Sequence, residues 1–404
     1  MSIQLHFGDW MRVGGEILHG EVELPFPQVI EDGIEEVHVK LRGRVYAQVT
    51  REVSEGVVAS YVVETERIET VRENVVVWTK GSAWPLTGEG VLRLPFEFLL
   101  PLNAQPSCKY SGVAREGDVS YFIEAVGVRS GLLSRNRRVS KPFAVVPPDP
   151  TGLELRKSLL SGWSGPLNTI SKSKNIRRGI WGSYAEIKAE LVLPDISTYP
   201  LFTKIPFTLR VITKTKEMKY DKKDEHKEVF PEPPRTPQAV SLVLRRHMKI
   251  NAQGWKENGE QTIAQLGGLG KDSDTPASEP QPVSLTFDKK WVPLGDNEKV
   301  GNWVQEMVVE SAFELKCTPS FTTRIFEQRN VIRLKIVFPG IGNDIEKEIP
   351  IKVTAGVITP TATAGAPLYE GSAENLDLPP TYWSANAWDD NDEKVASFAS
   401  KGKS

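Results

Sequence analysis

Cysteine is scarce in this sequence, with only Cys108 and Cys317 among 404 residues. Two distant cysteines exclude a disulfide-stapled scaffold and a zinc site made from several thiolates, and they are typical of buried thiols in a reducing compartment. Histidine is also rare, and none of the five histidines has a second ligand at metal-binding spacing. The sequence therefore predicts no metal site and no bound cofactor.

An excess of one charge and long hydrophobic runs are missing as well. The formal net charge of −2 gives nothing that would recruit nucleic acid. The most apolar stretch, residues 96–102, is interrupted by Pro101 and is far too short to span a bilayer. Residues 1–20 are polar and lack the pattern of a signal peptide. We therefore expect a cytoplasmic protein.

Catalytic signatures are equally hard to find. The sequence has no Gly-x-Ser-x-Gly elbow, phosphate loop or dinucleotide fingerprint. Paired carboxylates that meet only in space leave no sequence pattern, so a β-sandwich enzyme stays open as an alternative. We predict that the protein is not an enzyme.

Strict alternation of apolar and polar residues dominates the first half. Val37, Val39, Leu41, Val45 and Val49 share one face of a long strand, which we expect to be buried. The opposite face, which we expect to be wet, carries His38, Lys40, Arg42, Arg44, Tyr46, Gln48 and Thr50. Further strands are predicted at residues 17–24, 56–63, 68–78, 91–100, 120–128 and 138–146. Pro95 lies inside one of them and favours an edge position or a bulge.

Strand patterns resume after a proline-rich break. Residues 147–152 contain three prolines and are predicted to be a hinge between two domains. The later strands are expected at residues 185–193, 205–213, 239–250, 283–287, 307–317, 331–338 and 344–353. The fold class is therefore all-β, with two antiparallel β-sandwich domains at residues 1–146 and 153–354. The only helix that we expect is a short one near residues 103–110.

Three segments are too polar to bury. Residues 214–235 and 254–281 are predicted to be surface insertions in the second domain. Residues 355–404 have few aliphatic side chains and are predicted to form a disordered tail.

That tail contains Leu378-Pro379-Pro380-Thr381-Tyr382, a Pro-Pro-x-Tyr motif. Two consecutive prolines favour the extended polyproline II conformation, which WW domains bind in an aromatic groove. We assign the WW-domain contact to Leu378, Pro379, Pro380 and Tyr382. An inert proline-rich stretch is the plain alternative, but the acidic residues around the motif favour an accessible peptide. The related Ala366-Pro367-Leu368-Tyr369 lacks the first proline and is expected to be inert.

Basic residues form two notable clusters, and one insertion is rich in lysine. Solvated charge is the plain interpretation, and a surface for acidic peptides, phosphopeptides or anionic lipid headgroups is the functional one. The candidate residues for that surface are Arg135, Arg137, Arg138, Lys172, Lys174, Arg177 and Arg178. Candidate ubiquitin acceptors are Lys214, Lys216, Lys219, Lys222, Lys223 and Lys227.

The order of motifs in the first 146 residues resembles the N-domain of the arrestin fold family. Its opening strand is matched by the run from Gly15-Glu16 to Gly20, and the next by Val37-x-Val39-x-Leu41-x-Gly43. Three further runs are similar to later parts of the arrestin N-domain: Phe96-Glu97-Phe98-x-Leu100-Pro101, the residues from Val119 to Ala125, and Lys141-Pro142-Phe143. Residues 185–354 resemble an arrestin C-domain only in the spacing of their strands.

With the Pro-Pro-x-Tyr motif, the chain is most similar to α-arrestins, the arrestin-related trafficking adaptors. The resemblance implies a non-enzymatic adaptor that links cytoplasmic tails of membrane transporters or receptors to a HECT-type ubiquitin ligase with WW domains. It also implies ubiquitination of the client, endocytosis and sorting, with recruitment to the plasma membrane or endosomes and ubiquitin as a further partner. Many family members carry two or more such motifs, whereas this chain has one. A ligase-independent, retromer-type scaffold remains the alternative.

Overall fold

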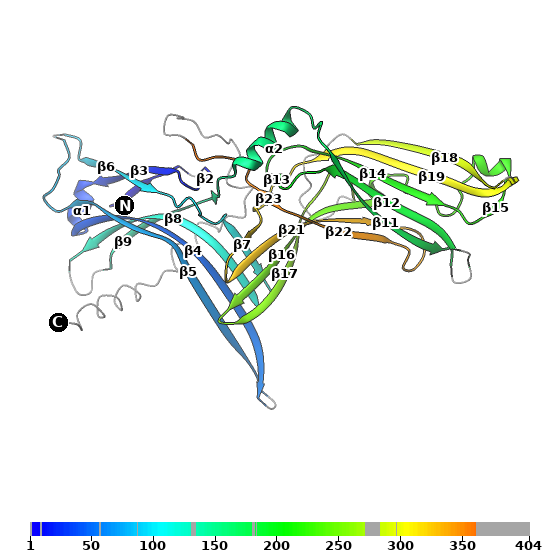
Figure 1. Ribbon diagram of the computed structural model, residues 1–404. Coiled ribbons are helices and arrows are strands. Elements are labelled where there is room, and N and C mark those ends of the chain that lie inside the picture. Colours follow the sequence, from blue (N-terminus) through cyan, green and yellow to red (C-terminus); the bar gives the residue numbers. More distant parts are fainter. Residues whose placement is uncertain are drawn as a thin grey trace.

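The fold is all-β, as predicted, with mostly antiparallel sheets. The computed structural model describes residues 2–8, 10–55, 58–86, 88–130, 135–179, 182, 184–270, 283–295 and 297–360. We call residues 2–146 the N-terminal half and residues 150–360 the C-terminal half. Figure 1 shows the two halves end to end, with one long hairpin reaching away from the body.

The N-terminal half has two larger sheets and a parallel pair of strands, β2 and β10. Its strands are β1 (Gln4–His6), β2 (Arg12–Val13), β3 (Ile17–Pro25), β4 (Ile34–Glu55), β5 (Val58–Thr79), β6 (Val91–Leu99), β7 (Cys108–Gly112), β8 (Arg115–Arg129), β9 (Arg137–Phe143) and β10 (Val145–Val146). One sheet has the order β5-β4-β8-β7, with β9 also paired to β8, and the other has the order β1-β3-β6. Pro95 lies in β6, an edge strand, as predicted, because an edge does not require its missing donor.

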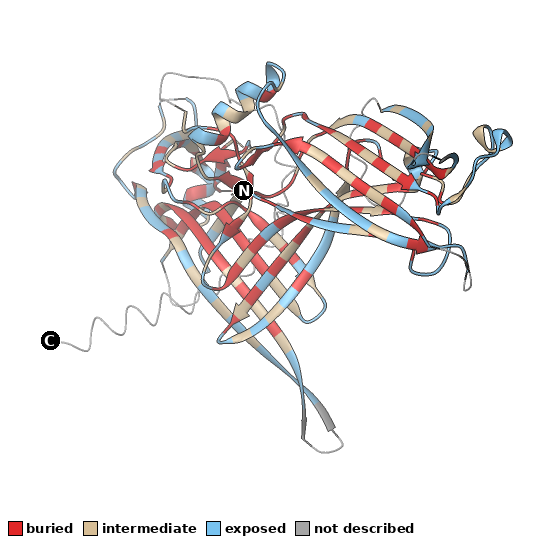
Figure 2. Ribbon diagram, turned by 45° about the vertical axis from the view of Figure 1, so that its right-hand side comes forward, coloured by how far each residue is buried: buried red, intermediate tan, exposed pale blue. Residues whose placement is uncertain are grey.

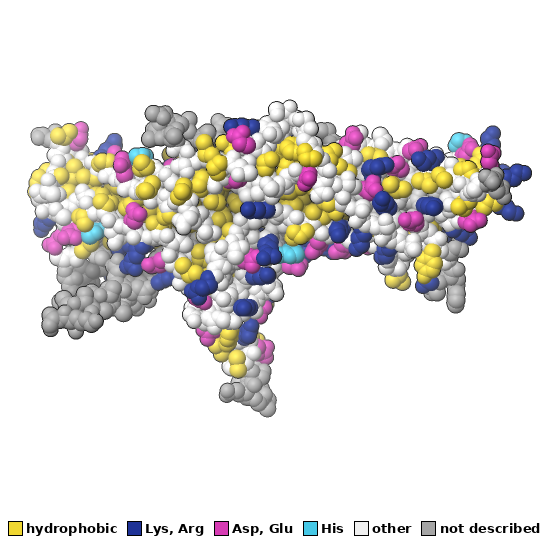
Figure 3. Space-filling view, in the orientation of Figure 1, with side chains coloured by type: hydrophobic (Ala, Val, Ile, Leu, Met, Phe, Trp, Pro, Cys, Tyr) yellow, Lys and Arg dark blue, Asp and Glu magenta, His cyan; other side chains and the backbone are white. Residues whose placement is uncertain are grey.

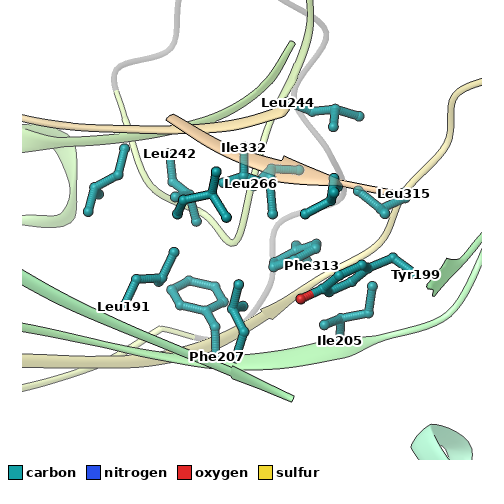
Figure 4. Packing of buried hydrophobic residues seen from close by; sticks show 14 of the residues in the cluster. Leu191, Tyr199, Ile205, Phe207, Leu242, Leu244, Leu266, Phe313, Leu315 and Ile332 are labelled. Carbon is teal, nitrogen blue, oxygen red and sulfur yellow. The ribbon is translucent and has the colours of Figure 1, made fainter. Parts of the chain in front are cut away.

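The C-terminal half also has two large sheets. Its strands are β11 (Leu167–Arg177), β12 (Tyr184–Pro194), β13 (Tyr199–Pro200), β14 (Ile205–Lys214), β15 (Met218–Lys219), β16 (Val240–Ala252), β17 (Trp255–Gln265), β18 (Ser284–Leu294), β19 (Asn297–Phe313), β20 (Phe321–Thr322), β21 (Phe326–Ile336), β22 (Ile345–Ile351) and β23 (Val353–Thr354). The sheets have the orders β11-β12-β14-β19-β15, with β18 on β19, and β17-β16-β21-β20, with β22 on β21. Leu191 and Phe207 face Leu242 and Ile332 across the core between them (Figure 4).

Helices are few, and they are not where the sequence suggested. The short helix expected near residues 103–110 is absent, because this segment leads directly into β7. The helices are α1 (Phe26–Glu31), α2 (Pro150–Leu160) and the 3₁₀ turns η1 (Lys222–Glu225) and η2 (Pro237–Ala239). The proline-rich segment predicted as a hinge therefore begins a helix. Pro150 occupies a first-turn position, where a missing backbone donor costs nothing, and the Asp149 side chain accepts from the Gly152 N–H.

The two predicted polar insertions have different structures. Trp255–Gln265, expected in a loop, form β17, which pairs with β16 along its length. Its sequence lacked a strand signal because β17 is an edge strand with many exposed positions. Residues 271–281 of that insertion lie outside the described residues. The other insertion, residues 214–235, is tied to the sheet by the buried Gln305, whose amide donates to the carbonyls of Val229 and Pro231 at 2.8 Å.

The two halves share their cores. Met248 and Ile250 of β16 and Phe326 of β21 are buried in the core of the N-terminal half, whereas Met11 and Val13 join the core of the C-terminal half. Polar contacts cross the same junction, which we call the seam. The Cys108 thiol lies 2.9 Å from Gln328 Oε1, and Arg246 donates to the Lys109 carbonyl at 3.0 Å. Burial alternates along most strands, and the buried positions continue through the seam (Figure 2).

Candidate functional site

The polar face of β4 is not the wet surface that its sequence predicted. Lys40, Arg42 and Arg44 are each less than a tenth exposed. Arg42 shows why: its guanidinium donates to the Glu73 carbonyl at 2.8 Å and to Asn74 Oδ1 at 2.6 Å, both on the neighbouring β5. Arg42 is covered because the neighbouring strand supplies acceptors for its buried guanidinium.

Arg44 forms the centre of a charged cluster on this face. Its Nε lies 3.7 Å from Asp118 Oδ2 on β8, and the Ser120 hydroxyl donates to the same carboxylate oxygen at 2.7 Å. Burial raises the pKa of the Asp118 carboxyl, although the Ser120 hydrogen bond, Arg44 and Lys109 oppose that shift. Burial also raises the pKa of Glu116, another carboxylate of β8. The cluster therefore places two carboxylates beside Arg44 in a buried setting that disfavours their charged forms.

Beside this cluster lies a cavity of about 500 Å³, which we call the seam cleft. It is lined by Arg44, Tyr46, Thr65, Glu66, Arg67, Gln253 and Arg324. The first five come from β4 and β5, and the last two come from the C-terminal half. Three guanidinium groups face one carboxylate, so the cleft suits a carboxylate or phosphate group, which arginine binds with paired donors.

Glu66 holds the two sides of the cleft together. Its Oε1 lies 2.5 Å from Arg324 Nη2, and its Oε2 accepts from the Gln253 N–H at 2.8 Å. The Glu66 side chain is 9% exposed, whereas that of Arg324 is 68% exposed. In the view of Figure 3, Lys and Arg side chains gather around the base of the long hairpin, with Asp and Glu side chains among them.

The predicted basic clusters do not come together. Arg137 pairs with Asp32 at 2.6 Å and Arg138 with Glu124 at 3.2 Å, at β9 in the N-terminal half, where Arg135 is exposed. Lys172, Lys174 and Arg177 are on β11 in the other half, and the exposed Arg178 follows directly.

Lys172 and Lys174 bridge the edge of the second sandwich. Lys172 Nζ donates to the Glu346 carbonyl at 2.6 Å, and Lys174 Nζ donates to the Asp344 carbonyl at 3.0 Å. Both ammonium groups therefore satisfy backbone acceptors beside β22, and the guanidinium of Arg177 lies over the Tyr184 ring. These contacts give the β11 cluster a structural role.

The other predicted sites divide between exposed and undescribed residues. All six candidate ubiquitin acceptors are exposed, between the end of β14 and the segment after η1. Leu378, Pro379, Pro380 and Tyr382 lie outside the described residues. Cys108 and Cys317 are buried, as predicted, and no disulfide joins them.

Two kinds of feature can be checked directly over the part of the chain that the structure describes: groups of metal ligands and membrane-spanning helices. Among the described residues, no group of three or more His, Cys, Asp and Glu side chains is arranged to hold a metal ion. None of the described helices is long and apolar enough to cross a membrane. Comparison with known proteins adds no relative, since the chain matches no protein-family model and no curated protein.

Sequence reasoning missed the seam cleft because its parts are distant in the chain. Arg42 and Arg44 were placed on the polar face of β4, but their neighbours on β5 and the C-terminal half could not be read from spacing. The only local signal was two arginines two residues apart in a strand whose other face is apolar.

Proposed function

We propose that this protein is a non-enzymatic adaptor of the arrestin-related type, which links a membrane-protein client to a HECT-type ubiquitin ligase. The observation that carries the proposal is the Pro-Pro-x-Tyr motif of residues 378–382, which follows a folded all-β body. A preordered polyproline II segment loses little conformational entropy on binding, so a short peptide is sufficient for a WW domain. The ligase would then reach lysines of the client, or the exposed lysines between residues 214 and 227.

The seam cleft is the proposed site for the client. A cytoplasmic tail rich in aspartate, glutamate or phosphate would present several anionic groups to Arg44, Arg67 and Arg324. Such a client would bring the adaptor to the plasma membrane or endosomes. A single motif binds a WW domain with a Kd on the order of 10–100 μM, so the two contacts together supply the avidity.

A titration of the full chain with a ligase WW domain tests the ligase contact. We expect Tyr382→Ala to abolish measurable binding, because it removes the ring that fills the second pocket of the domain. Tyr369→Ala is the matched control, since it removes a tail tyrosine that lacks the double proline, and it should leave the affinity unchanged. If the WW domain still binds Tyr382→Ala, the ligase-independent scaffold becomes the better account.

The client contact needs a separate test. Fluorescence anisotropy with a labelled, multiply phosphorylated acidic peptide should show binding to the full chain that weakens about tenfold in Arg67→Glu. Arg93→Glu is the control, because Arg93 is 67% exposed and pairs with Glu23 within the β1-β3-β6 sheet, which does not line the cleft. Equal weakening in both variants would indicate a general charge effect and would remove the seam cleft as the client site.

A further inference from the structure

One edge of the second sandwich is formed by a strand whose charges all have the same sign. Residues 167–179, which contain β11 and the two residues after it, include Lys172, Lys174, Arg177 and Arg178 but no acidic residue. β11 is the first strand in the order of its sheet, and among the described residues it pairs only with β12. We call β11 together with Arg178 the basic edge.

Every second residue of β11 turns its backbone groups away from β12. The Arg177 carbonyl accepts from the side chain of the buried Asn343, which belongs to the turn between β21 and β22 in the other sheet, and this bond places the carbonyl on the open side of the strand. In an antiparallel strand the N–H and C=O groups of one residue point the same way, and this direction alternates along the chain. The backbone groups of Ser171, Ser173 and Asn175 therefore also point outward, and all three residues are exposed.

The two lysines of the basic edge are held by groups that carry no net charge. Lys172 Nζ donates to the Glu346 carbonyl, and Lys174 Nζ donates to the carbonyls of Gly342 and Asp344. These contacts lie at the margin of the sandwich where β11 and β22 are neighbours (Figure 1). Because a backbone carbonyl does not neutralise an ammonium group, both positive charges remain available to a ligand.

The carboxylates nearby are mostly engaged with other cations. Three of them have partners of their own: Asp344 pairs with Lys335, Glu346 with Arg333, and Glu190 of β12 with Arg210. Glu186 of β12 lies opposite Asn175, and it makes no ion pair with any residue that the structure describes. This carboxylate offsets one of the four basic residues, so the edge keeps an excess of positive charge.

A second basic edge strand lacks this excess. β9 pairs with β8 and carries Arg137 and Arg138. Arg137 lies 2.6 Å from the carboxylate of Asp32, and Arg138 lies 3.2 Å from that of Glu124. The arginines of β9 are therefore neutralised within the fold, whereas the cations of the basic edge are not.

These features select one kind of partner. An open edge accepts a further strand, whose own N–H and C=O groups extend the ladder. A second copy of β11 is disfavoured, because it would place basic side chains opposite basic side chains. A phosphate of a lipid or nucleic acid supplies negative charge but no alternating backbone donors and acceptors. An extended acidic peptide supplies both the charge and the backbone groups.

We propose that the basic edge binds an extended acidic peptide of a partner protein, which adds to the sheet as a strand beside β11. Its backbone pairs with the outward groups of residues 171–175, and its acidic side chains approach Lys172 and Lys174 on one face and Arg177 on the other. The seam cleft shares no residue with this site. The inference does not depend on the adaptor function, since it concerns any protein that presents such a peptide.

A binding measurement on the full chain tests the backbone pairing. The probe is a fluorescent decapeptide of alternating glutamate and valine, followed by anisotropy. Ser173→Pro removes one outward N–H and leaves the pairing with β12, because an edge strand tolerates proline where its N–H faces away from the sheet. We expect binding at least about fivefold weaker, as for a lost hydrogen bond. Ser173→Ala is the matched control and should bind normally, and equal affinities of the two variants would overturn the proposal.

The contribution of charge is tested with two further variants. Arg178→Glu should weaken binding of the decapeptide about threefold at low salt, because it reverses an exposed charge of the basic edge. Arg67→Glu changes the seam cleft and should leave the affinity unchanged. A loss in Arg67→Glu with none in Ser173→Pro would place the peptide in the seam cleft and would rule out the basic edge.

Hydrogen exchange gives a pattern that only strand addition produces. When the decapeptide binds, exchange at the amides of Ser171, Ser173 and Asn175 should slow, whereas the amides of Lys172 and Lys174, which face β12, should not change. Exchange at those two lysine amides also shows whether β11 stays paired in Ser173→Pro. Slowing at neither group, or equal slowing at both groups, would contradict the proposal.

Modified peptides test the same point without changing the protein. One version of the decapeptide is N-methylated on its valines and another on its glutamates, so that both keep the full negative charge. A strand added at an edge uses the backbone groups of alternate residues. One version should therefore lose binding while the other keeps it, and equal behaviour of the two versions would show that β11 does not pair with the peptide.

Discussion

The Glu66 carboxylate joins the two halves of the chain, since one oxygen lies 2.5 Å from Arg324 Nη2 and the other accepts from the Gln253 N–H. Glu66 therefore lines the seam cleft and also connects its two sides. An anionic ligand in the cleft would approach the same guanidinium that Glu66 engages. The stability of the junction and the occupancy of the cleft are thus expected to be linked.

The contribution of Glu66 to the junction of the two halves can be tested by substitution. Glu66→Ala should lower the free energy of unfolding by about 1 kcal/mol, mainly through the lost hydrogen bond to the backbone of Gln253. The pair with Arg324 adds little, because that side chain is mostly exposed and screened by solvent. Urea unfolding measures the change. Glu64→Ala, on the same strand, should have almost no effect. An equal loss in both variants would show that Glu66 does not specifically stabilise the junction of the two halves.

The pH dependence of stability is expected to report on Asp118. Burial raises the pKa of this carboxyl in the folded state, so the folded protein holds its proton more tightly than the unfolded chain does. The contribution of Asp118 to stability is therefore most favourable below the ordinary aspartate pKa of about 3.9 and falls as the pH rises through the raised value.

Asp118→Asn removes this titration while keeping an acceptor for Ser120. As the pH rises from 4 to 7, the free energy of unfolding of the variant should increase relative to that of the native chain. Urea unfolding at each pH measures the difference. The groups that face Asp118 are Arg44 on β4, Lys109 on β7 and Glu116 on β8. A difference that does not change with pH would mean that Asp118 titrates normally.

How far the sequence predicts this structure depends on the range of the interactions. The long strand at residues 34–55 was recognisable because its alternation is local, and Pro95 identified an edge for the same reason. The strand β17 was not predicted, because an exposed edge strand needs few apolar residues. Burial of Arg42 was missed, since its acceptors lie on β5 at positions set by pairing register. The seam cleft could not be predicted from the sequence, because Glu66 contacts Arg324 only after both halves have folded.

The seam also relies on a close approach between an aromatic ring and a glycine. A Cβ atom at Gly259 in β17 would lie 2.5 Å from the Tyr110 hydroxyl oxygen and 2.6 Å from Cζ of its ring. Gly259→Ala should therefore force Tyr110 aside and lower the free energy of unfolding by about 2 kcal/mol, as overpacking does in a core. In a Tyr110→Leu background the same substitution should cost much less, which a double-mutant cycle in urea measures. Additive losses would show that the ring and the glycine are not in contact.

Asp149 is expected to be the most important polar residue at the base of α2. Its Oδ1 accepts from the Gly152 N–H at 3.0 Å and caps the helix, while its Oδ2 accepts from the Gly356 N–H at 3.2 Å. One carboxylate therefore holds both the first turn of α2 and the segment that follows β23. Asp149→Ala should lower the free energy of unfolding by about 2 kcal/mol, because it removes a helix cap and a second hydrogen bond.

Asp149→Asn separates the two roles. Its single amide oxygen can still cap α2, but its NH₂ group cannot accept from Gly356, so the expected loss is about half of that in the alanine variant. Hydrogen exchange at the Gly356 amide should accelerate in both variants, whereas exchange at the Gly152 amide should accelerate only in Asp149→Ala. Equal effects of the two substitutions on Gly152 would contradict the assignment of the cap.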